Sequence, residues 1–339
     1  MLRGERRIST IWQRDWIKTG EFTVTILVTG AAGFIGSHLC ERLIGRGAAV
    51  VGLDNFDPFY DPAVKRRNVK QLLESDAFDL IEGDIRDSDC VQSILARGGV
   101  EAIVHLAARA GVRPSIEDPV GYMDVNINGT VVMLEAARKY NIKKFIFASS
   151  SSVYGNNKKV PFAETDPVDY PISPYAATKK TGELICHTYG HLYDIGMTCL
   201  RFFTVYGPRQ RPDLAIHKFA RLIEAGRSIP VFGDGSMRRD FTYIDDIIDG
   251  VVAAIDRCGG YAIYNLGESR PVRLDALIAC LEAALGKQAV IDRQPEQPGD
   301  VIQTYADVDK AVNRLGYRPK TELADGLEKF VRWLRNEQR

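Results

Sequence analysis

The sequence has no excess of either charge, because its 339 residues include 44 Lys and Arg and 44 Asp and Glu side chains. A zero net charge gives no electrostatic indication of a nucleic acid or an anionic membrane surface as a partner. The six cysteines lack the paired short spacings of disulfide or metal sites, so we expect reduced core residues in a cytoplasmic protein. Because the histidines are also dispersed, no metal is expected.

Residues 1–23 contain no continuous apolar stretch, although they include basic and aromatic side chains. They therefore match neither a secretory signal nor a membrane span. We expect this segment to be a disordered extension, and the alternative is an upstream misassigned start.

A glycine-rich turn follows the first apolar run of the chain. Residues 24–28 have the β-branched and apolar composition of a buried parallel strand, and helical spacing of apolar residues follows at Ile35, Leu39 and Leu43. Between them stand the three glycines of a dinucleotide-binding turn, which tighten the turn, let backbone approach a pyrophosphate and let helix pack on strand. These are Gly30, Gly33 and Gly36.

The next apolar strand, 48–53, ends in Asp54, about twenty residues beyond the turn, where a carboxylate would bind a ribose 2′-hydroxyl. Asp54 would repel a 2′-phosphate, and the next residues, Asn55 and Phe56, are not arginine. The pattern therefore favours NAD over NADP. The alternative is that Asp54 is a solvated residue at a strand end.

Further apolar runs at 78–82, 102–106, 144–148 and 197–203 alternate with helical segments. This order predicts an α/β fold with a parallel sheet, helices on both faces and ligands at the carboxyl ends of the strands. We expect Asp84 and Ile85 at the adenine edge. The predicted cofactor-binding residues are Gly30, Gly33, Phe34, Ile35, Gly36, Asp54, Asn55, Asp84, Ile85, Leu106, Ala107, Ala108, Tyr175, Lys179 and Phe202.

A serine-tipped strand precedes a helix that begins near Ser173 and carries Tyr175 and Lys179. These two residues are four apart, so they share one helix face. A surface pair is the alternative for any such spacing. After a dinucleotide turn and a serine-tipped strand, the combination is much more specific.

Four motifs stand in a familiar order: Thr29-Gly-Ala-Ala-Gly-Phe-Ile-Gly36, His105-Leu-Ala-Ala108, the segment from Ser149 to Gly155, and Tyr175-Ala-Ala-Thr-Lys179. Together they resemble the extended short-chain dehydrogenase/reductase superfamily, and within it the nucleotide-sugar epimerases. The resemblance implies a Rossmann-type doubly wound parallel sheet with a smaller C-terminal α/β lobe. It implies that residues 24–200 are mainly the NAD-binding domain and 201–339 mainly the nucleotide-sugar lobe, with some segments returning to the first domain.

The resemblance also implies that Ser150, Tyr175 and Lys179 are the catalytic residues. A free tyrosine has a pKa of about 10, so its phenolate needs stabilisation by a nearby ammonium and the positive nicotinamide. Lys179 would supply the ammonium and bind the nicotinamide ribose, while Ser150 would align the sugar hydroxyl. Tyr175 would then remove a proton as NAD takes the hydride.

The C-terminal part resembles the sugar-nucleotide side of the family. The segment 229–235 resembles its uracil-flanking loop, Arg239 matches an arginine placed on the diphosphate, and Asp300 matches a residue that holds the uridine ribose. A salt bridge at a helix start, with Asp240 or Asp245, is the alternative for Arg239. The expected substrate-binding residues are Arg113, Ser151, Ser152, Thr204, Arg211, Val231, Phe232, Arg239 and Asp300.

Ser151 and Ser152 indicate an epimerase rather than a dehydratase or a decarboxylase, because related enzymes of those two kinds have acidic residues at the matching positions. The segments 54–62, 110–113, 200–213 and 330–333 look most like UDP-glucuronate 4-epimerases. We therefore expect reversible C4 epimerisation of UDP-glucuronate to UDP-galacturonate. The alternatives are a UDP-glucose 4-epimerase, a UDP-glucuronate decarboxylase, a nucleotide-sugar dehydratase and a non-catalytic NAD(P)-binding regulator, although such regulators typically lose the catalytic tyrosine or lysine.

Arg211 is the hypothesised ligand of the sugar carboxylate, in a loop restricted by Pro208 and Pro212. The alternatives are an exposed loop arginine, or one that pairs with Asp213 or the diphosphate. By analogy with the family, we expect a homodimer formed through the helix of Tyr175 and the helix near 122–140.

Overall fold

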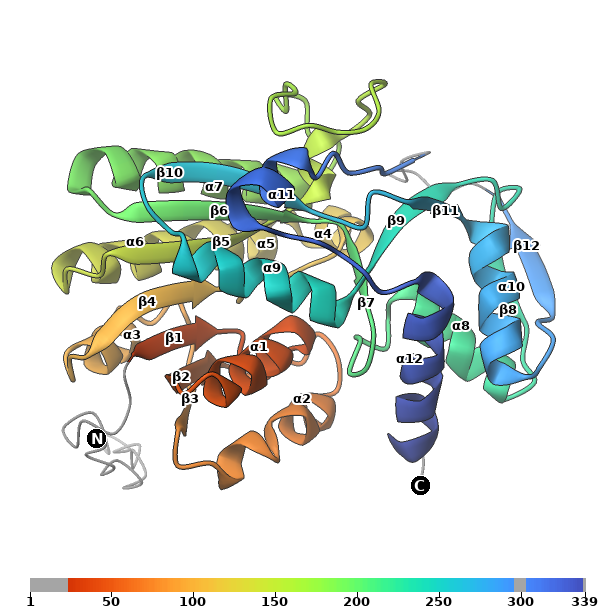
Figure 1. The fold of residues 1–339 in the computed structure, drawn as a ribbon, viewed down its shortest axis with the longest axis horizontal. Coiled ribbons are helices and arrows are strands. Elements are labelled where there is room, and N and C mark those ends of the chain that lie inside the picture. Colours follow the sequence, from red (N-terminus) through yellow and green to blue (C-terminus); the bar gives the residue numbers. More distant parts are fainter. Residues whose placement is uncertain (1–23, 296–302, 338–339) are drawn as a thin grey trace, which may run out of the picture.

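The computed structural model describes residues 24–295 and 303–337. The extension predicted at 1–23 and the predicted ribose ligand Asp300 lie outside these ranges. Within them, the chain forms a mixed α/β fold in which a central parallel sheet is covered by helices on both faces (Figure 1).

The central sheet has seven parallel strands in the order β10-β6-β5-β4-β1-β2-β3. The order reverses between β1 and β4, which is the point where doubly wound sheets bind their ligands. The predicted doubly wound α/β fold is therefore confirmed. The strands are β1 (Thr25–Thr29), β2 (Ala49–Asp54), β3 (Phe78–Glu82), β4 (Val100–His105), β5 (Lys144–Ser150), β6 (Gly196–Phe202) and β10 (Tyr261–Leu266).

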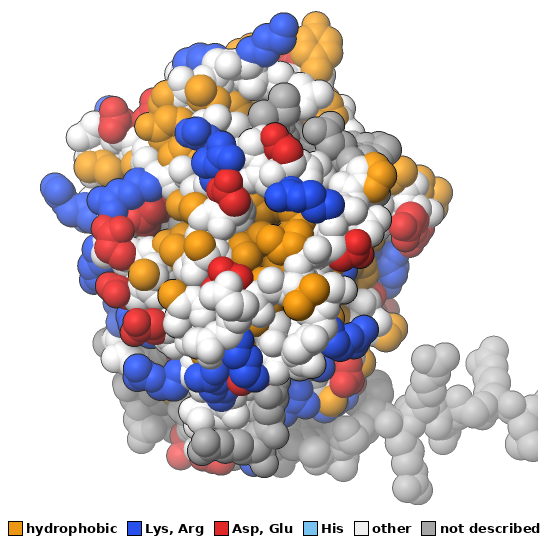
Figure 2. All heavy atoms as spheres, turned by 90° about the vertical axis from the view of Figure 1, so that its right-hand side faces the viewer, with side chains coloured by type: hydrophobic (Ala, Val, Ile, Leu, Met, Phe, Trp, Pro, Cys, Tyr) orange, Lys and Arg blue, Asp and Glu red, His pale blue; other side chains and the backbone are white. Residues whose placement is uncertain are grey.

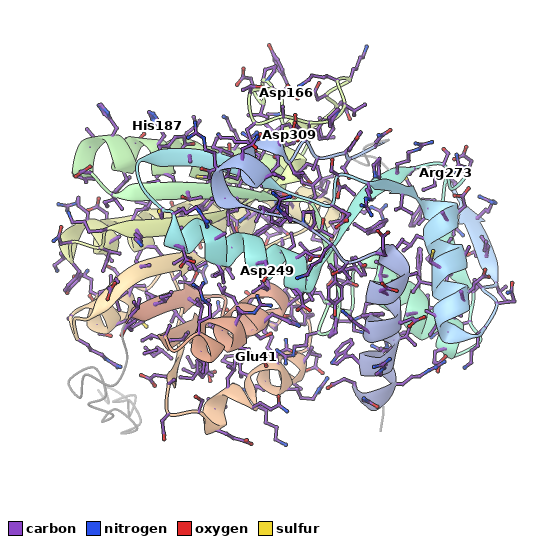
Figure 3. All side chains as sticks on the ribbon, in the orientation of Figure 1. Glu41, Asp166, His187, Asp249, Arg273 and Asp309 are labelled. Carbon is purple, nitrogen blue, oxygen red and sulfur yellow. The ribbon has the colours of Figure 1, made fainter. Side chains whose placement is uncertain are left out.

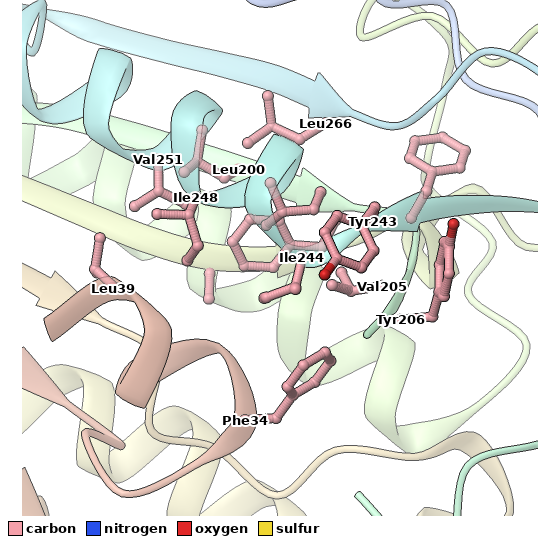
Figure 4. Close-up of a cluster of buried hydrophobic side chains, with 14 of the residues drawn as sticks. Phe34, Leu39, Leu200, Val205, Tyr206, Tyr243, Ile244, Ile248, Val251 and Leu266 are labelled. Atoms are coloured by element: carbon pink, nitrogen blue, oxygen red, sulfur yellow. The ribbon is translucent and has the colours of Figure 1, made fainter. Parts of the chain in front are cut away.

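Alternate residues of the strands enter two different cores. Ile26 and Val28 of β1 belong to one core, whereas Leu27 between them belongs to the other. The first core is covered by α1 (Phe34–Gly45) and α9 (Ile244–Asp256), and Figure 4 shows Leu39 of α1 beside Ile248 of α9. The second lies under α3 (Ser88–Leu95), α6 (Gly129–Lys139) and α7 (Pro174–Tyr193). Apolar runs with both faces buried are typical of parallel strands.

Shorter helices connect these layers. α2 (Pro62–Val69) follows β2, and α4 (Val112–Glu117) and α5 (Pro119–Met123) follow β4. The π-helix η3 (Asp124–Asn128) leads from α5 into α6. The 3₁₀ turn η2 (Leu72–Glu74) precedes β3, η4 (Ser151–Tyr154) follows β5, and α11 (Asp309–Leu315) packs near β10.

The smaller lobe lies at one end of the central sheet, on the right of Figure 1. It contains a three-stranded sheet in the order β11-β9-β7 and a two-stranded parallel sheet of β12 and β8. Its strands are β7 (Thr204–Tyr206), β8 (Ile229–Phe232), β9 (Arg238–Tyr243), β11 (Pro271–Arg273) and β12 (Ile291–Gln294). Its helices are α8 (Ala215–Glu224), α10 (Leu274–Leu285) and α12 (Leu323–Glu337).

One expectation for this lobe is wrong. The segment 229–235, expected as a loop, begins with strand β8, because Ile229 and Val231 are buried and pair in register with Ile291 and Arg293 of β12. This pairing joins segments far apart in sequence, so no local pattern predicts it. Arg239 lies in strand β9, five residues before α9 begins at Ile244, and its role stays a prediction.

Segments of the second half of the chain return to the central sheet, as β10 forms one of its edges and α9 packs on α1. Asp240 of β9 holds the surrounding loops together. Its buried carboxylate accepts hydrogen bonds from the backbone N–H groups of Glu268 at 2.7 Å and of Ser269 and Ala306 at 3.0 Å. Burial raises the pKa of Asp240, and these bonds lower it. The domain boundaries themselves stay a prediction.

The surface agrees with the balanced composition. On the face shown in Figure 2, hydrophobic side chains gather in a central depression, and basic and acidic side chains are interspersed around it. All six cysteines are free, with Cys40, Cys186 and Cys199 buried, as reduced core residues would be; the cytoplasmic location predicted from them stays a prediction. Among the described residues, no helix is both long and apolar enough to cross a membrane.

Candidate active site

The glycine turn after β1 makes a contact that only glycine permits. Gly30 has a φ of +70°, and a Cβ there would lie 2.9 Å from the backbone N of Ala107, at the end of β4. A Cβ on Gly36 would lie 2.1 Å from the carbonyl oxygen of Gly30. The first turn of α1 therefore packs directly on the loop, with its backbone N–H groups at the carboxyl edge of the sheet. This cradle fits the pyrophosphate of a dinucleotide.

A cavity of about 510 Å³ opens beside this turn, at the carboxyl ends of β1, β2, β4 and β5. Among the described residues predicted for the site, all line this cavity except Asp84, Arg113, Val231, Phe232 and Arg239. The cavity thus brings the glycine turn, Asp54 and the serine-tipped strand together with Tyr175 and Lys179. A single chamber of this kind can hold the reactive ends of a cofactor and a substrate side by side.

Asp54 is not a solvated residue at a strand end, because only 6% of it is exposed. Its carboxylate accepts hydrogen bonds from the backbone N–H groups of Ala32 at 3.0 Å and Phe56 at 2.8 Å. Burial raises the pKa of Asp54, whereas the charge of Lys65 and these two bonds lower it. A carboxylate held beside the glycine turn fits the ribose hydroxyls of an adenosine.

The five exceptions lie outside the cavity for separate reasons. Asp84 faces Arg86, whose Nη2 lies 2.7 Å from Oδ2 and whose bonds lower the pKa of Asp84 to about 2; its neighbours Gly83 and Ile85 line the cavity instead. Arg113 lies over the ring of Phe232, with 4.7 Å between its Cζ atom and the ring centroid. The side chain of Val231 is buried in the smaller lobe, and the Nη1 atom of Arg239 donates to the Arg238 carbonyl at 2.9 Å.

Helix α7 begins with a strong cap. Ser173 accepts a hydrogen bond from the backbone N–H of Ala176 at 3.1 Å, and Pro174 occupies the first helical position. Lys179, one helical turn after Tyr175, is 4% exposed and donates to the carbonyl of Ala148 at 2.7 Å. Burial lowers the pKa of Lys179 to about 8. The surface-pair alternative is therefore wrong for Tyr175 and Lys179.

Tyr175 is perturbed by groups other than the predicted lysine. Burial raises the pKa of Tyr175, while a hydrogen bond with Ser150 and the charge of Arg211 lower it. The Nζ atom of Lys179 is 6.0 Å from the tyrosine ring centroid and bonds to the Ala148 carbonyl. The sequence therefore predicted Ser150 beside Tyr175 but not the effect of Arg211, and the catalytic role of Tyr175 stays a prediction.

Arg211 lines the cavity with a side chain that is 15% exposed. Its Nε and Nη2 atoms donate to the two carboxylate oxygens of Asp213 at 3.0 and 2.7 Å, and Nη2 also donates to the Ala110 carbonyl at 3.2 Å. Its guanidinium lies over the ring of Phe59, with Cζ 4.9 Å from the centroid. The pairing with Asp213 that the sequence left open is thus present, and the exposed-loop alternative is wrong.

The connection after β2 supplies residues that the sequence did not assign to the site. Asp57, Phe59, Tyr60 and Lys65 all line the cavity. The Nζ atom of Lys65 lies 3.8 Å from Oδ1 of Asp54 and 5.0 Å from the ring centroid of Tyr60. The available signal was a weak one, the helix face of α2 on which Lys65, Asn68 and Val69 are buried. Nothing in the local sequence shows that this helix face lies towards the glycine turn after β1.

The histidines play structural roles where their contacts are defined. His105, at the end of β4, lies between Thr29 and Thr130, at 2.8 and 3.1 Å, and burial lowers its pKa to about 3. His187 lies on the exposed side of α7, away from the cavity (Figure 3). Across residues 24–295 and 303–337, no group of three or more His, Cys, Asp and Glu side chains is arranged to hold a metal ion.

Comparison with known proteins places these features in a family. Residues 26–267 match the model described as the NAD dependent epimerase/dehydratase family. The chain is 45% identical over 329 residues to UDP-glucuronate 4-epimerase 4 of Arabidopsis thaliana, which covers 91% of this chain and 75% of that protein.

Two solved structures are similar over nearly the whole chain. UDP-glucuronic acid 4-epimerase from Bacillus cereus, in complex with UDP-glucuronic acid and NAD, matches with a TM-score of 0.88 and 39% identity over 93% of this chain and all (100%) of that one. UDP-glucose 4-epimerase from Thermotoga maritima, with UDP-glucose, matches with a TM-score of 0.87 and 33% identity over the same 93% and 100%.

The buried lysine makes the stability of the ligand-free protein depend on pH. The pKa of Lys179 is about 8 in the folded chain against 10.5 for an ordinary lysine, so between these values the unfolded chain binds the proton and the folded chain does not. The free energy of unfolding should therefore rise with pH across this interval, with a slope of at most ~1.4 kcal/mol per pH unit from this group. Urea denaturation of the wild type and Lys179→Met measures this contribution. An identical slope in the two proteins would contradict it.

Proposed function

This chain belongs to the NAD dependent epimerase/dehydratase family, and we propose from this that it interconverts the C4 epimers of a UDP-sugar with NAD as its cofactor. The observation that carries the proposal is the cavity itself. It joins a glycine turn and the buried carboxylate of Asp54 to Ser150, Tyr175 and Lys179. Those three side chains can move one proton at a sugar hydroxyl, which is what reversible oxidation at C4 requires.

The residues have separate tasks in this chemistry. Bound NAD supplies the acceptance and return of a hydride at C4 of the sugar. Ser150 aligns the C4 hydroxyl and lowers the pKa of Tyr175, whose phenolate accepts the hydroxyl proton and later gives it back. The Lys179 ammonium, held by the Ala148 carbonyl, is positioned to bind the nicotinamide ribose and to favour the phenolate. Rotation of the 4-keto sugar before the hydride returns gives the opposite configuration.

UDP-glucuronate is the proposed substrate. The relatives above carry names and bound ligands of that sugar, and Arg211 offers a guanidinium at the cavity wall that suits a carboxylate. In the ligand-free protein Asp213 occupies this guanidinium, so a sugar carboxylate would have to replace Asp213 or share Arg211 with it. The similarity to a UDP-glucose 4-epimerase keeps the neutral sugar as the second candidate.

Ser151 and Ser152 support epimerisation over further processing of the 4-keto sugar. Both line the cavity in the 3₁₀ turn after β5, where no carboxylate replaces them. The ketone of UDP-glucuronate is a β-keto acid, which loses carbon dioxide readily once its carboxylate aligns with the carbonyl π system. A serine pair provides no acid or base for that step, and Arg211 would hold the carboxylate out of alignment.

We also propose a homodimer, formed through α7 and the helices next to it. Large apolar side chains are exposed there, including Val120 of α5 at 77% and Leu192 of α7 at 60%, and a second copy would cover them. Sedimentation equilibrium should give twice the chain mass of 37.7 kDa. A monomer at micromolar concentration would overturn this part of the proposal.

The reaction is tested by product identity. Incubation with UDP-glucuronate should give UDP-galacturonate as the main product, and a UDP-pentose as the main product would replace the epimerase proposal with a decarboxylase. Tyr175→Phe should bind NAD as the wild type does and turn over at least ~10²-fold more slowly, because it lacks the acidic hydroxyl. Normal turnover by Tyr175→Phe would remove Tyr175 from its assigned role.

The sugar selectivity is tested at Arg211. Arg211→Ala should lower kcat/KM for UDP-glucuronate by ~10–100-fold, the equivalent of one charge-assisted contact, and leave UDP-glucose nearly unchanged. Arg209→Ala is the matched control, since Arg209 lies in the same loop and pairs with Glu41 at 2.6 Å outside the cavity. Equal losses on both sugars would assign Arg211 to the diphosphate instead.

A further inference from the structure

One face of α7 carries three polar side chains spaced four residues apart: Tyr175, Lys179 and Glu183. The first two belong to the proposed site. Glu183 is fully buried at 0% exposure and does not line the cavity. Burying a carboxylate is costly unless its oxygens are bonded, so its contacts identify what it does.

The partners of this helix face are consecutive residues of β5. Lys179 donates to the carbonyl of Ala148 at 2.7 Å, and the Ser149 hydroxyl donates to Oε1 of Glu183 at 2.6 Å. The next residue, Ser150, lines the cavity with Tyr175 and lowers the pKa of that tyrosine. The helix is thus hydrogen-bonded to the strand at two successive positions, next to the residue that faces Tyr175. Each position on β5 meets a different turn of α7.

The packing between the same two elements leaves little room for α7 to slide. A Cβ on Gly182 would lie 2.2 Å from Cζ of Phe147, the residue that precedes Ala148. The strand therefore touches the helix backbone at Phe147 and the helix side chains at the next two residues. A sideways or rotational shift of α7 would break several of these contacts at once.

Arg201 of β6 holds Glu183, the last of these α7 residues, in place. Its Nε and Nη2 atoms donate to the two carboxylate oxygens of Glu183, each at 2.8 Å, and Arg201 is only 1% exposed. Its Nη1 atom donates to the hydroxyl of Tyr154 at 2.9 Å, at the end of the turn that carries Ser151 and Ser152. A bidentate guanidinium–carboxylate pair fixes geometry as well as charge. The same guanidinium therefore holds α7 and the end of that turn.

We propose that Glu183, fixed by Arg201 and bonded to Ser149, is a positioning residue for catalysis, which sets how α7 docks on β5 and so keeps Tyr175 in register with Ser150. The inference rests on the proposed function, because it concerns the same tyrosine and serine. Ser149 and Ser150 are neighbours, with Cα atoms about 3.8 Å apart, so a shift at one reaches the other. A misplacement of about 1 Å can lower a rate ~10²-fold.

The first test removes the hydrogen bond between Ser149 and Glu183 without disturbing the ion pair between Glu183 and Arg201. Ser149→Ala should lower kcat about 10-fold while KM for the UDP-sugar and the NAD content stay at wild-type values. A direct contact of Ser149 with substrate would instead raise KM. Thr198→Val is the matched control, because Thr198 on β6 is also a buried hydroxyl, bonded to Cys258 at 3.5 Å away from the cavity. This control should keep the wild-type kcat.

The second test asks whether the two residues act as one unit. Glu183→Gln should lower kcat with KM unchanged, and Ser149→Ala/Glu183→Gln should lose no more than the larger single loss. If Glu183→Gln does not fold, Ser149→Ala still decides the matter. If the losses of kcat multiply in the double variant, the two residues do not act as one unit and the proposal fails. A wild-type kcat in Ser149→Ala would also overturn it.

A pH readout separates positioning from general loosening. Ser150 lowers the pKa of Tyr175, so moving the tyrosine away from this serine should move the acidic limb of the kcat profile to higher pH in Ser149→Ala. An unchanged profile would overturn the proposal even if the melting temperature falls.

A substrate-free measurement keeps this test independent of the proposed reaction. The absorbance titration of Tyr175, taken as the difference between each protein and its Tyr175→Phe counterpart, should shift upward in Ser149→Ala and stay in place in Thr198→Val. If the wild type epimerises no UDP-sugar, the proposed function fails, and this titration still supports or overturns the positioning role of Glu183.

Discussion

The close contact between the turn after β1 and the end of β4 is the constraint on which the site depends. Gly30 can lie against Ala107 only because it has no Cβ, and the two strands therefore meet tightly at the point where the strand order reverses. Helix α1 packs onto this junction through Gly36 for the same reason. Once these backbones touch, the carboxyl ends of β2 and β5 on either side surround a single cavity. The chemistry is then a question of which side chains stand at those ends.

The sequence predicted what local patterns encode. β-branched runs identified the seven strands of the central sheet apart from the edge strand β10, and the glycines and the Tyr175–Lys179 spacing located the cavity. It failed where distant segments decide the outcome. Strand β8 depends on β12, and Lys65 enters the site only because α2 folds back over Asp54. Arg201 and Glu183 lie on separate elements, and neither has a neighbour in sequence that shows the pair. The partner of Arg211 was foreseen as an alternative because Asp213 is two residues away.

Charged side chains around the cavity are committed to bonds that also shape it. Asp54 is bonded to the backbone of both flanking loops, and Arg211 is bonded to Asp213 and to the Ala110 carbonyl. A group fixed in this way, as Asp54 is, needs no reorganisation when a ligand arrives, which is the condition for strong electrostatic stabilisation. Arg211 is distinct because its partner Asp213 is half exposed, with 43% of that side chain in solvent. A ligand carboxylate can therefore compete for this guanidinium more easily than for Arg201, whose partner is fully buried.

The arrangement on α7 also explains why Lys179 does not pair with the carboxylate four residues away. Lys179 and Glu183 are four residues apart, the spacing at which a lysine and a glutamate on one helix normally pair. Here Arg201 occupies both oxygens of Glu183, and Lys179 bonds instead to a neutral carbonyl, that of Ala148. Because a carbonyl carries no net charge, it does not raise the pKa of Lys179 as a carboxylate would, and the effect of burial prevails. The ion pair between Arg201 and Glu183 thus occupies the carboxylate that lies four residues from Lys179 on the same helix.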